Sequence, residues 1–140
     1  MSATKILIVD DSFVVRKALQ LKLTQAGFDV LIAGDGGEAL ATLRSDRPDL
    51  IILDIDFPPD VGHGGGIAWD GILIMQWIGR IEETKNIPVI IITGQDPAKF
   101  RDKVMKLGAK AFFTKPVNNE MLVKAIRDAL SQAVPAANAA

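Results

Sequence analysis

The chain lacks cysteine entirely and has a single histidine, His63, among its 140 residues. Without cysteine it can form neither a disulfide framework nor a cysteine-ligated zinc site. A metal site built from several histidines is also excluded, since only one histidine is present. These absences rule out a disulfide-rich secreted domain and the common zinc-binding modules.

Long apolar runs and a strong excess of one charge are also missing. No apolar run approaches the ~18 residues that a membrane span needs, and the segment from Met1 to Ile6 lacks the layout of a secretory signal peptide. Lysine and arginine number 16 against 17 acidic residues, whereas a nucleic-acid-binding surface is usually basic. We therefore expect a cytoplasmic protein that spans no membrane and binds no nucleic acid directly.

The length and the apolar content favour one globular domain. Hydrophobic residues make up 49% and charged residues 24% of the chain, which is ordinary for a globular protein, and 140 residues suit a single domain. We expect residues 1–130 to form this domain. Residues 131–140 are rich in alanine and lose helical periodicity, so we expect a frayed end or a linker there.

Five short apolar runs alternate with amphipathic segments along the chain. The runs are continuously apolar, which is typical of strands covered on both faces in a parallel sheet. Strict alternation of strands and helices predicts one open, doubly wound α/β domain with right-handed crossovers. The expected strands are Lys5–Val9, Phe28–Ala33, Leu50–Leu53, Pro88–Ile92 and Ala109–Phe113.

The segments between these runs carry apolar residues at helical spacing. Gly27 and Gly108 are expected to end the first and fourth helices, the second should begin after Gly37, and Asn118 suits the N-cap of the fifth. The expected inward positions are Val15, Ala18, Leu19 and Leu23; Ala39, Leu40 and Leu43; Ile74, Trp77, Ile78 and Ile81; Phe100, Val104 and Leu107; and Leu122, Ala125, Ile126, Ala129 and Leu130.

A long irregular loop is expected over residues 55–69. It contains two prolines and a glycine-rich stretch around His63, which no regular element tolerates. The loop lacks the Gly-Lys-Ser/Thr ending of a phosphate-binding loop and follows the third strand, so we do not expect it to bind nucleotides. His63 is expected to be exposed, and Trp69 could cover the nearby edge of the sheet or anchor the loop.

Polar residues stand where four of the five predicted strands end: Asp10 and Asp11, then Asp54, Thr93 and Lys115. Ligands of open parallel sheets bind outside the carboxyl ends of the strands. Three carboxylates, one hydroxyl and one ammonium group are therefore expected at one edge. Carboxylates ~4 Å apart repel by about 4 kcal/mol per pair at an effective dielectric constant of ~20, so this edge needs positive charge.

Magnesium and a phosphoryl group would give each of these side chains a role. Mg²⁺ is a hard cation that prefers oxygen ligands, and Lys115 supplies a second positive charge. A carboxylate can act as a nucleophile and form an acyl phosphate. Cations and a hydroxyl donor then stabilise the phosphoryl oxygens.

This pattern resembles the receiver domain of two-component response regulators. The resemblance extends from about Lys5 to Leu130, and its motifs occur in order: Val9-Asp10-Asp11-Ser12, Leu53-Asp54, Thr93-Gly94 and Lys115-Pro116. It implies a flavodoxin-like (βα)5 domain with a five-stranded parallel sheet of order 2-1-3-4-5. It also implies that the chain is a signalling switch and not an enzyme. Such a switch catalyses only its own phosphorylation and slow dephosphorylation.

The resemblance assigns a role to each site residue. Asp54 would accept a phosphoryl group from a phosphohistidine on a sensor histidine kinase or a histidine phosphotransfer protein. Asp10, Asp11 and Asp54 would bind Mg²⁺ with the backbone carbonyl of Asp56. The partners are therefore a phosphohistidine donor and a downstream protein or output domain, and phosphorylation could drive homodimerisation.

Four further residues have implied roles in the response to phosphorylation. Lys115 would pair with the phosphoryl group, and Thr93 would hydrogen-bond it. Phe112 would turn inward as Thr93 moves, and Pro116 would follow a cis peptide bond. The surface formed by the fourth helix, fifth strand and fifth helix would then change its packing and its affinity for a partner.

The chain also departs from the family pattern after Asp54. Pro58 matches a family proline, but the Asp-Gly pair that normally follows soon after is delayed to Asp70-Gly71. The Asp56 side chain adds a carboxylate beside the acceptor, so we expect an altered lifetime of the phosphorylated state. Phe112 lacks the hydroxyl group of tyrosine, so its switching must depend on burial.

Two other functions could use the same residues. A phosphatase resembling the haloacid dehalogenase superfamily also uses Asp-x-Asp, which Asp54-Ile55-Asp56 spells, but in that family the motif ends the first strand. A receiver-like module that only binds partners would normally lack one of the site residues. Individually, Asp10 and Asp11 could be ordinary acids at a helix N-terminus, Thr93 an ordinary strand residue, and Phe112 a core aromatic.

Overall fold

The computed structural model describes residues 4–55, 71–82, 84–94 and 97–133. Of the loop expected over 55–69, only Ile55 falls within these ranges, so His63 and Trp69 lie outside the described residues. Strands and helices alternate strictly, as expected. They are β1 (Lys5–Val9), α1 (Phe13–Gln25), β2 (Asp29–Ala33), α2 (Gly36–Asp46), β3 (Leu50–Asp54), α3 (Gly71–Arg80), β4 (Val89–Thr93), α4 (Pro97–Lys106), β5 (Ala111–Thr114) and α5 (Asn119–Ala133).

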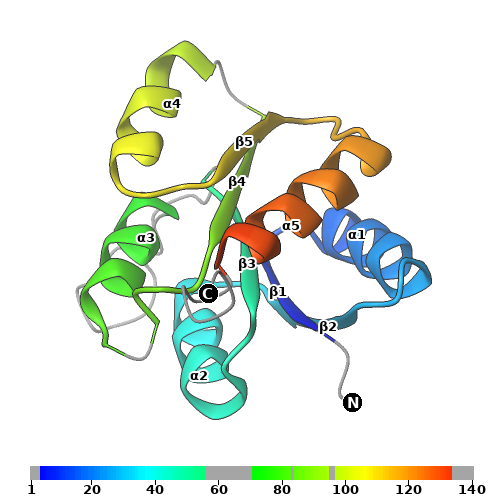
Figure 1. Cartoon of the computed structure of the whole chain (residues 1–140), viewed down its shortest axis with the longest axis horizontal. Coiled ribbons are helices and arrows are strands. Elements are labelled where there is room, and N and C mark those ends of the chain that lie inside the picture. The colour runs from blue at the N-terminus through cyan, green and yellow to red at the C-terminus, as the bar shows by residue number, and fades with distance from the viewer. Residues whose placement is uncertain (1–3, 56–70, 83, 95–96, 134–140) are drawn as a thin grey trace, which may run out of the picture.

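The five strands form one sheet in the order β2-β1-β3-β4-β5. All four strand pairs are parallel. Helices α1 and α5 cover one face of the sheet, and α2, α3 and α4 cover the other (Figure 1). The predicted doubly wound α/β fold and its strand order are confirmed. Among the described residues, no helix is long and apolar enough to cross a membrane.

The strands are apolar throughout because both faces of the sheet are covered. Successive side chains of a strand point to opposite faces. In β1, Ile6 and Ile8 pack with α1 and α5, while Leu7 and Val9 pack into the core on the other face. All four side chains are fully buried. Because both faces of the sheet are apolar, the polar residues of the predicted site lie where the strands end.

Local signals set several helix boundaries. The Asn118 side chain accepts a hydrogen bond from the Met121 N–H at 3.1 Å, which confirms the predicted N-cap of α5. Gly27 and Gly108 have φ angles of 99° and 108°, which glycine adopts without steric cost. The expected start of α2 was wrong. Its N-cap is Asp35, whose side chain accepts from the Glu38 N–H, so the helix begins at Gly36.

Three residues expected to face inward are exposed. Leu107 is 36% exposed because α4 ends at Lys106 and the chain reverses at Gly108, which places Ala109 in the buried position instead. Trp77 is 38% exposed and lies in the groove between α2 and α3. Ala18 is exposed because Leu19 and Leu23 form the buried stripe of α1.

Two more expectations concern helices α4 and α5. The inward position proposed for Phe100 lies outside the described side chains. Helix α5 continues to Ala133, past the expected end at Leu130. Alanine and serine tolerate helical backbone, so the helix can include residues 131–133.

The sheet itself supplies a matched pair for testing the core. Ile8 and Ile32 are partners in the register of β1 and β2, but Ile8 is fully buried whereas Ile32, on the edge strand, is 41% exposed. Ile8→Ala is expected to lower the free energy of unfolding by about 2–5 kcal/mol, since it removes buried methyl groups and leaves a cavity. Ile32→Ala should lower the free energy of unfolding by less than half as much. Urea unfolding measures this free energy for both variants, and equal losses would contradict the described core.

Candidate functional site

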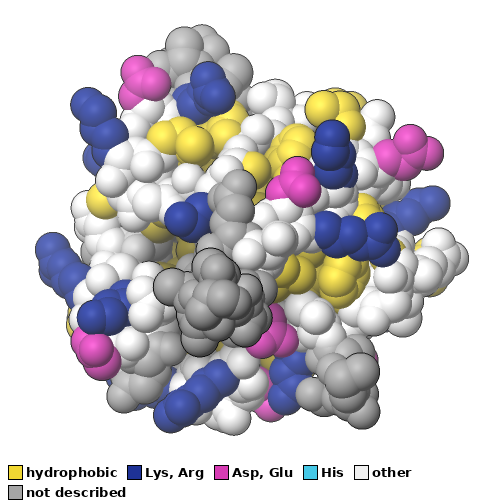
Figure 2. Space-filling view, viewed as in Figure 1, with side chains coloured by type: hydrophobic (Ala, Val, Ile, Leu, Met, Phe, Trp, Pro, Cys, Tyr) yellow, Lys and Arg dark blue, Asp and Glu magenta, His cyan; other side chains and the backbone are white. Residues whose placement is uncertain are grey.

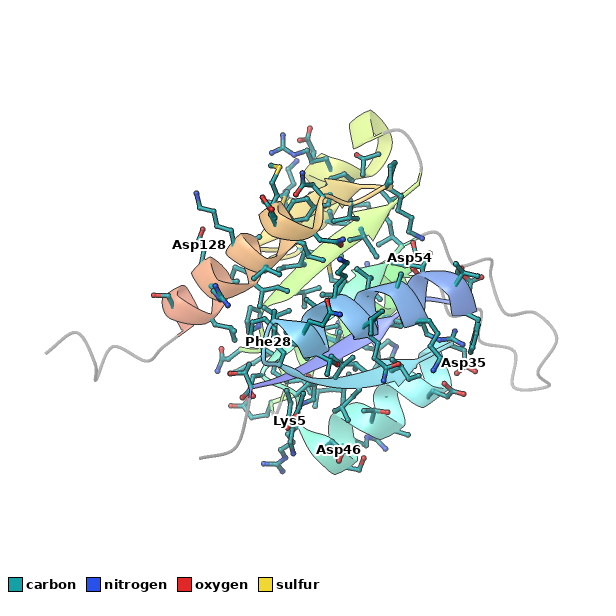
Figure 3. All side chains as sticks on the ribbon, turned by 90° about the vertical axis from the view of Figure 1, so that its right-hand side faces the viewer. Lys5, Phe28, Asp35, Asp46, Asp54 and Asp128 are labelled. Carbon is teal, nitrogen blue, oxygen red and sulfur yellow. The ribbon has the colours of Figure 1, made fainter. Side chains whose placement is uncertain are left out.

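The strand order brings the carboxyl ends of β1 and β3 together. Val9 and Leu53 are partners in the register of these strands, so Asp10, which follows β1, lies beside Asp54, the last residue of β3. Figure 3 shows Asp54 at the same end of the sheet as Asp35, with Lys5 and Asp46 at the opposite end. The polar strand ends therefore share one edge, as the sequence predicts.

Three carboxylates meet at this edge. One oxygen atom from each of Asp10, Asp11 and Asp54 lies within 4.8 Å of the others. Asp10 and Asp54 are buried, with exposed fractions of 0% and 1%, while Asp11 is exposed. Burial strengthens the repulsion among these groups, because less water screens them.

Asp10 is held by contacts to each of its polar groups. Its N–H donates to the Ala33 carbonyl at 3.1 Å, and its carbonyl accepts from Arg16 Nη1 at 2.7 Å. Its Oδ1 accepts from the Ser12 N–H at 2.8 Å. Its Oδ2 lies 3.1 Å from Lys115 Nζ, but the angle makes this an ion pair and not a hydrogen bond.

Arg16 and the Ser12 N–H were not predicted as parts of this site. A signal for both was available. Asp-x-Ser favours a turn in which the aspartate side chain binds a backbone N–H two residues later. Long helical side chains point back toward the N-terminus, so an arginine in the first turn of α1 can reach the end of β1.

Lys115 lies between the two buried carboxylates. Its Nζ donates to Asp54 Oδ2 at 3.1 Å and is equally far from Asp10 Oδ2. Its backbone N–H donates to the Thr93 carbonyl at 2.7 Å, which ties it to the end of β4. The Lys115–Pro116 peptide bond is cis, in agreement with the expectation.

The two carboxylates keep the Lys115 ammonium charged. Burial alone lowers the pKa of Lys115, but the negative charges of Asp54 and Asp10 outweigh burial and raise this pKa above 10.5. A raised pKa in the folded state contributes stability that is fully present below 10.5 and is lost as the pH rises through the folded value.

We expect an NMR titration of the Lys115 side chain in metal-free protein to show this shift. Its midpoint should lie above 10.5, and Asp54→Asn should lower it, because that change removes the largest influence that raises the pKa. A midpoint below the ordinary lysine value, or one unmoved by Asp54→Asn, would contradict the described ion pairs.

The residues at this edge fit a hard divalent cation. Lys115 offsets only part of the charge of three carboxylates, and the buried Asp10 Oδ2 lacks a hydrogen-bond donor of good geometry. Carboxylate oxygens are the ligands that Mg²⁺ prefers, and the bound ion usually retains several waters. Because Asp11 is exposed, there is room for these waters on its side of the cluster. Asp10, Asp11 and Asp54 are therefore compatible with a Mg²⁺ site, while the proposed ligand Asp56 lies outside the described residues.

Adding Mg²⁺ is expected to stabilise the protein. At ten times its Kd the free energy of unfolding should rise by about 1.4 kcal/mol. Asp11→Asn should weaken Mg²⁺ at least tenfold, since even in water a unit charge ~4 Å from a divalent ion contributes about 2 kcal/mol. Asp35→Asn is the control, because it removes a charge at the same edge and asparagine still caps α2. Thermal unfolding at increasing Mg²⁺ concentration measures how much the ion stabilises each variant. Equal stabilisation of Asp11→Asn and Asp35→Asn would contradict the site.

Thr93 and Phe112 occupy the neighbouring strands. Thr93 is fully buried at the end of β4, and the register pairs Asp54 with Ile92, the residue before it. Phe112 in β5 is partly buried and packs against the core on the α2, α3 and α4 face of the sheet. These positions suit the expected roles, and they equally suit an ordinary strand threonine and a core aromatic.

Comparison with known families identifies the kind of domain. A family model described as the response regulator receiver domain matches residues 6–127. The chain belongs to this family. Receiver domains are the signalling modules of response regulators in two-component systems, where they act with histidine kinases and output domains. They are signalling switches and not enzymes in the usual sense.

Similar proteins support the same assignment. Protein PilH of Pseudomonas aeruginosa is 34% identical over 91% of this chain and 98% of its own length. Response regulator PleD of Caulobacter vibrioides is 35% identical, but the chain spans only 26% of it. The chain likewise spans 49% of the probable transcriptional regulator ycf27 of Porphyridium aerugineum, at 30% identity.

A solved structure agrees in fold. The chemotaxis response regulator CheY4 of Vibrio cholerae has a TM-score of 0.77 at 29% identity, and the match covers 91% of this chain and 99% of that one. This similarity confirms the flavodoxin-like arrangement of the receiver domain.

Proposed function

We propose that this receiver domain takes a phosphoryl group from a phosphohistidine onto Asp54 and thereby controls a partner. The donor is a sensor histidine kinase or a histidine phosphotransfer protein. The observation that carries the proposal is the Lys115 ammonium, which lies 3.1 Å from both Asp10 and Asp54 within a cluster of three carboxylates. A cluster of buried carboxylates is costly unless cations offset its charge.

The transfer forms one bond and breaks one bond. An oxygen of the Asp54 carboxylate attacks phosphorus, while the bond from phosphorus to the imidazole nitrogen of the donor breaks and its electrons leave with that nitrogen. Lys115 then pairs with the phosphoryl oxygens, and the Thr93 hydroxyl donates to one of them. When bound by Asp10, Asp11, Asp54 and the Asp56 carbonyl, Mg²⁺ supplies further positive charge against these oxygens.

The output of this switch is the surface of α4, β5 and α5. In this proposal Thr93 and Phe112 connect the site to this surface. The Lys115 N–H donates to the Thr93 carbonyl and so ties the ends of β5 and β4 together. Met105 and Met121 are exposed there, and Figure 2 shows apolar side chains at the surface over the regions that Figure 1 assigns to α4 and α5. Such side chains suit a binding surface for an output protein or for a second copy of the chain.

The intact mass of the protein tests this function. After incubation with a small acyl phosphate and Mg²⁺, we expect the mass to increase by one phosphoryl group, and EDTA should prevent the increase. A folded protein that gains no phosphoryl group would overturn the proposal and favour a module that only binds partners. Continuous turnover of generic phosphate esters would favour a phosphatase instead.

A further inference from the structure

Arg16 links the metal-binding turn to a neighbouring turn of the fold. It lies in the first turn of α1 and donates from Nη1 to the carbonyl oxygen of Asp10 at 2.7 Å. Hydrogen bonds from a charged donor are shorter and stronger than neutral ones. The guanidinium carbon also lies 5.9 Å from the centre of the Phe13 ring, which restricts the side chain further.

The space for this guanidinium exists because residue 34 is glycine. A β-carbon added to Gly34 would lie 2.9 Å from Arg16 Nη1, which is closer than such atoms approach in folded proteins. The backbone of the same turn is fixed by Glu38, whose Oε2 accepts from the Gly34 N–H at 2.8 Å. The Arg16 side chain is therefore held between the turn after β1 and the turn after β2.

We propose that Arg16 is a positioning residue that holds the Asp10–Asp11 turn in the conformation that binds the divalent cation, and that Gly34 provides the space it needs. This inference rests on the proposed function. Asp11 itself is exposed, and it follows directly after the carbonyl group that Arg16 binds. Fixing that carbonyl therefore restricts the backbone from which the Asp11 carboxylate projects.

Charge and position predict opposite effects of removing Arg16. A cation near the site repels Mg²⁺, so by charge alone Arg16→Gln would tighten Mg²⁺ binding. If Arg16 positions the turn, the same change weakens binding, because partners that orient metal ligands typically contribute about 10- to 100-fold in affinity. The direction of the change in Kd thus distinguishes the two roles.

Two further variants complete the test. Gly34→Ala keeps the charge of Arg16 but displaces the end of its flexible side chain, so it should also weaken Mg²⁺ binding. Lys17→Gln is the matched control. Lys17 carries the same charge in the same helical turn and also lies over Phe13, at 5.8 Å, and its removal should leave Mg²⁺ binding unchanged or slightly tighter.

The experiment measures the Kd of Mg²⁺ by NMR for the wild-type protein and the three variants. We expect Arg16→Gln and Gly34→Ala to bind about tenfold more weakly. In metal-free protein, hydrogen exchange of the Ser12 amide, which donates to Asp10 Oδ1, should be faster in both. The NMR spectrum also shows whether each variant is folded.

Two results would overturn the inference in distinguishable ways. A wild-type protein that binds Mg²⁺ while Arg16→Gln binds as tightly or more tightly would overturn the positioning role alone. A wild-type protein that binds no Mg²⁺ would overturn the proposed metal site together with the positioning role.

Discussion

Asp54→Asn is expected to abolish phosphorylation of the protein by a small acyl phosphate. Asparagine has nearly the same shape as aspartate, but its amide lacks the anionic oxygen that attacks phosphorus. The change also removes one of the two buried carboxylates next to Lys115, so it relieves repulsion and should not unfold the domain. Intact mass spectrometry measures the effect, with no phosphorylated species expected at any Mg²⁺ concentration.

Asp10→Asn is the control that separates the acceptor from a metal ligand. Asp10 belongs to the same cluster and is equally buried, but in the proposed reaction it only helps to bind the cation. Phosphorylation of Asp10→Asn should be slower and should recover as Mg²⁺ is raised. Phosphorylation of Asp54→Asn, or loss of phosphorylation in Asp10→Asn that no Mg²⁺ concentration restores, would contradict these assignments.

Lys115→Met is expected to lower the free energy of unfolding of the metal-free protein strongly. The change leaves the carboxylates of Asp10 and Asp54 buried without their ammonium partner. Removing one member of a buried ion pair typically costs about 3–5 kcal/mol. Because a bound cation supplies the missing positive charge, Mg²⁺ should restore more stability to this variant than to the wild-type protein.

The stability change is read from urea unfolding with and without Mg²⁺. Lys110→Met is a suitable control, since Lys110 is exposed, lies near the start of β5 and makes no ion pair among the described residues. It should change the free energy of unfolding by less than about 0.5 kcal/mol. Equal stability of Lys115→Met and the wild-type protein without Mg²⁺ would contradict the role of Lys115 as counter-charge.

The elements of the fold could be predicted because their signals are local. Lys5–Val9 was predicted as a strand with the bounds that the structure shows, since its apolar run is short and bounded by polar residues. Leu107 was placed wrongly because helical spacing cannot show where α4 ends. The reversal at Gly108 depends on hydrogen bonds from residues 108 and 109 to the last turn of the helix, and it gives the buried position to Ala109.

The site could be predicted only in part from the sequence. The polar strand ends are visible in the chain, but their proximity depends on the strand order, which came from the resemblance to receiver domains. Burial of Asp10 and the shared contact of Lys115 with Asp10 and Asp54 are tertiary properties. The contact from Arg16 to the Asp10 carbonyl leaves no periodic pattern, because it joins a side chain to the backbone, and its one signal is the place of Arg16 in the first turn of α1.

The central claim is that Asp54, and no other carboxylate at this edge, accepts the phosphoryl group. The most direct test is to phosphorylate the protein with an acyl phosphate and Mg²⁺, reduce the acyl phosphate with borohydride and locate the modified residue by peptide mass spectrometry. We predict modification of Asp54 alone. Modification of Asp10, Asp11 or Asp56 with Asp54 intact would contradict the account.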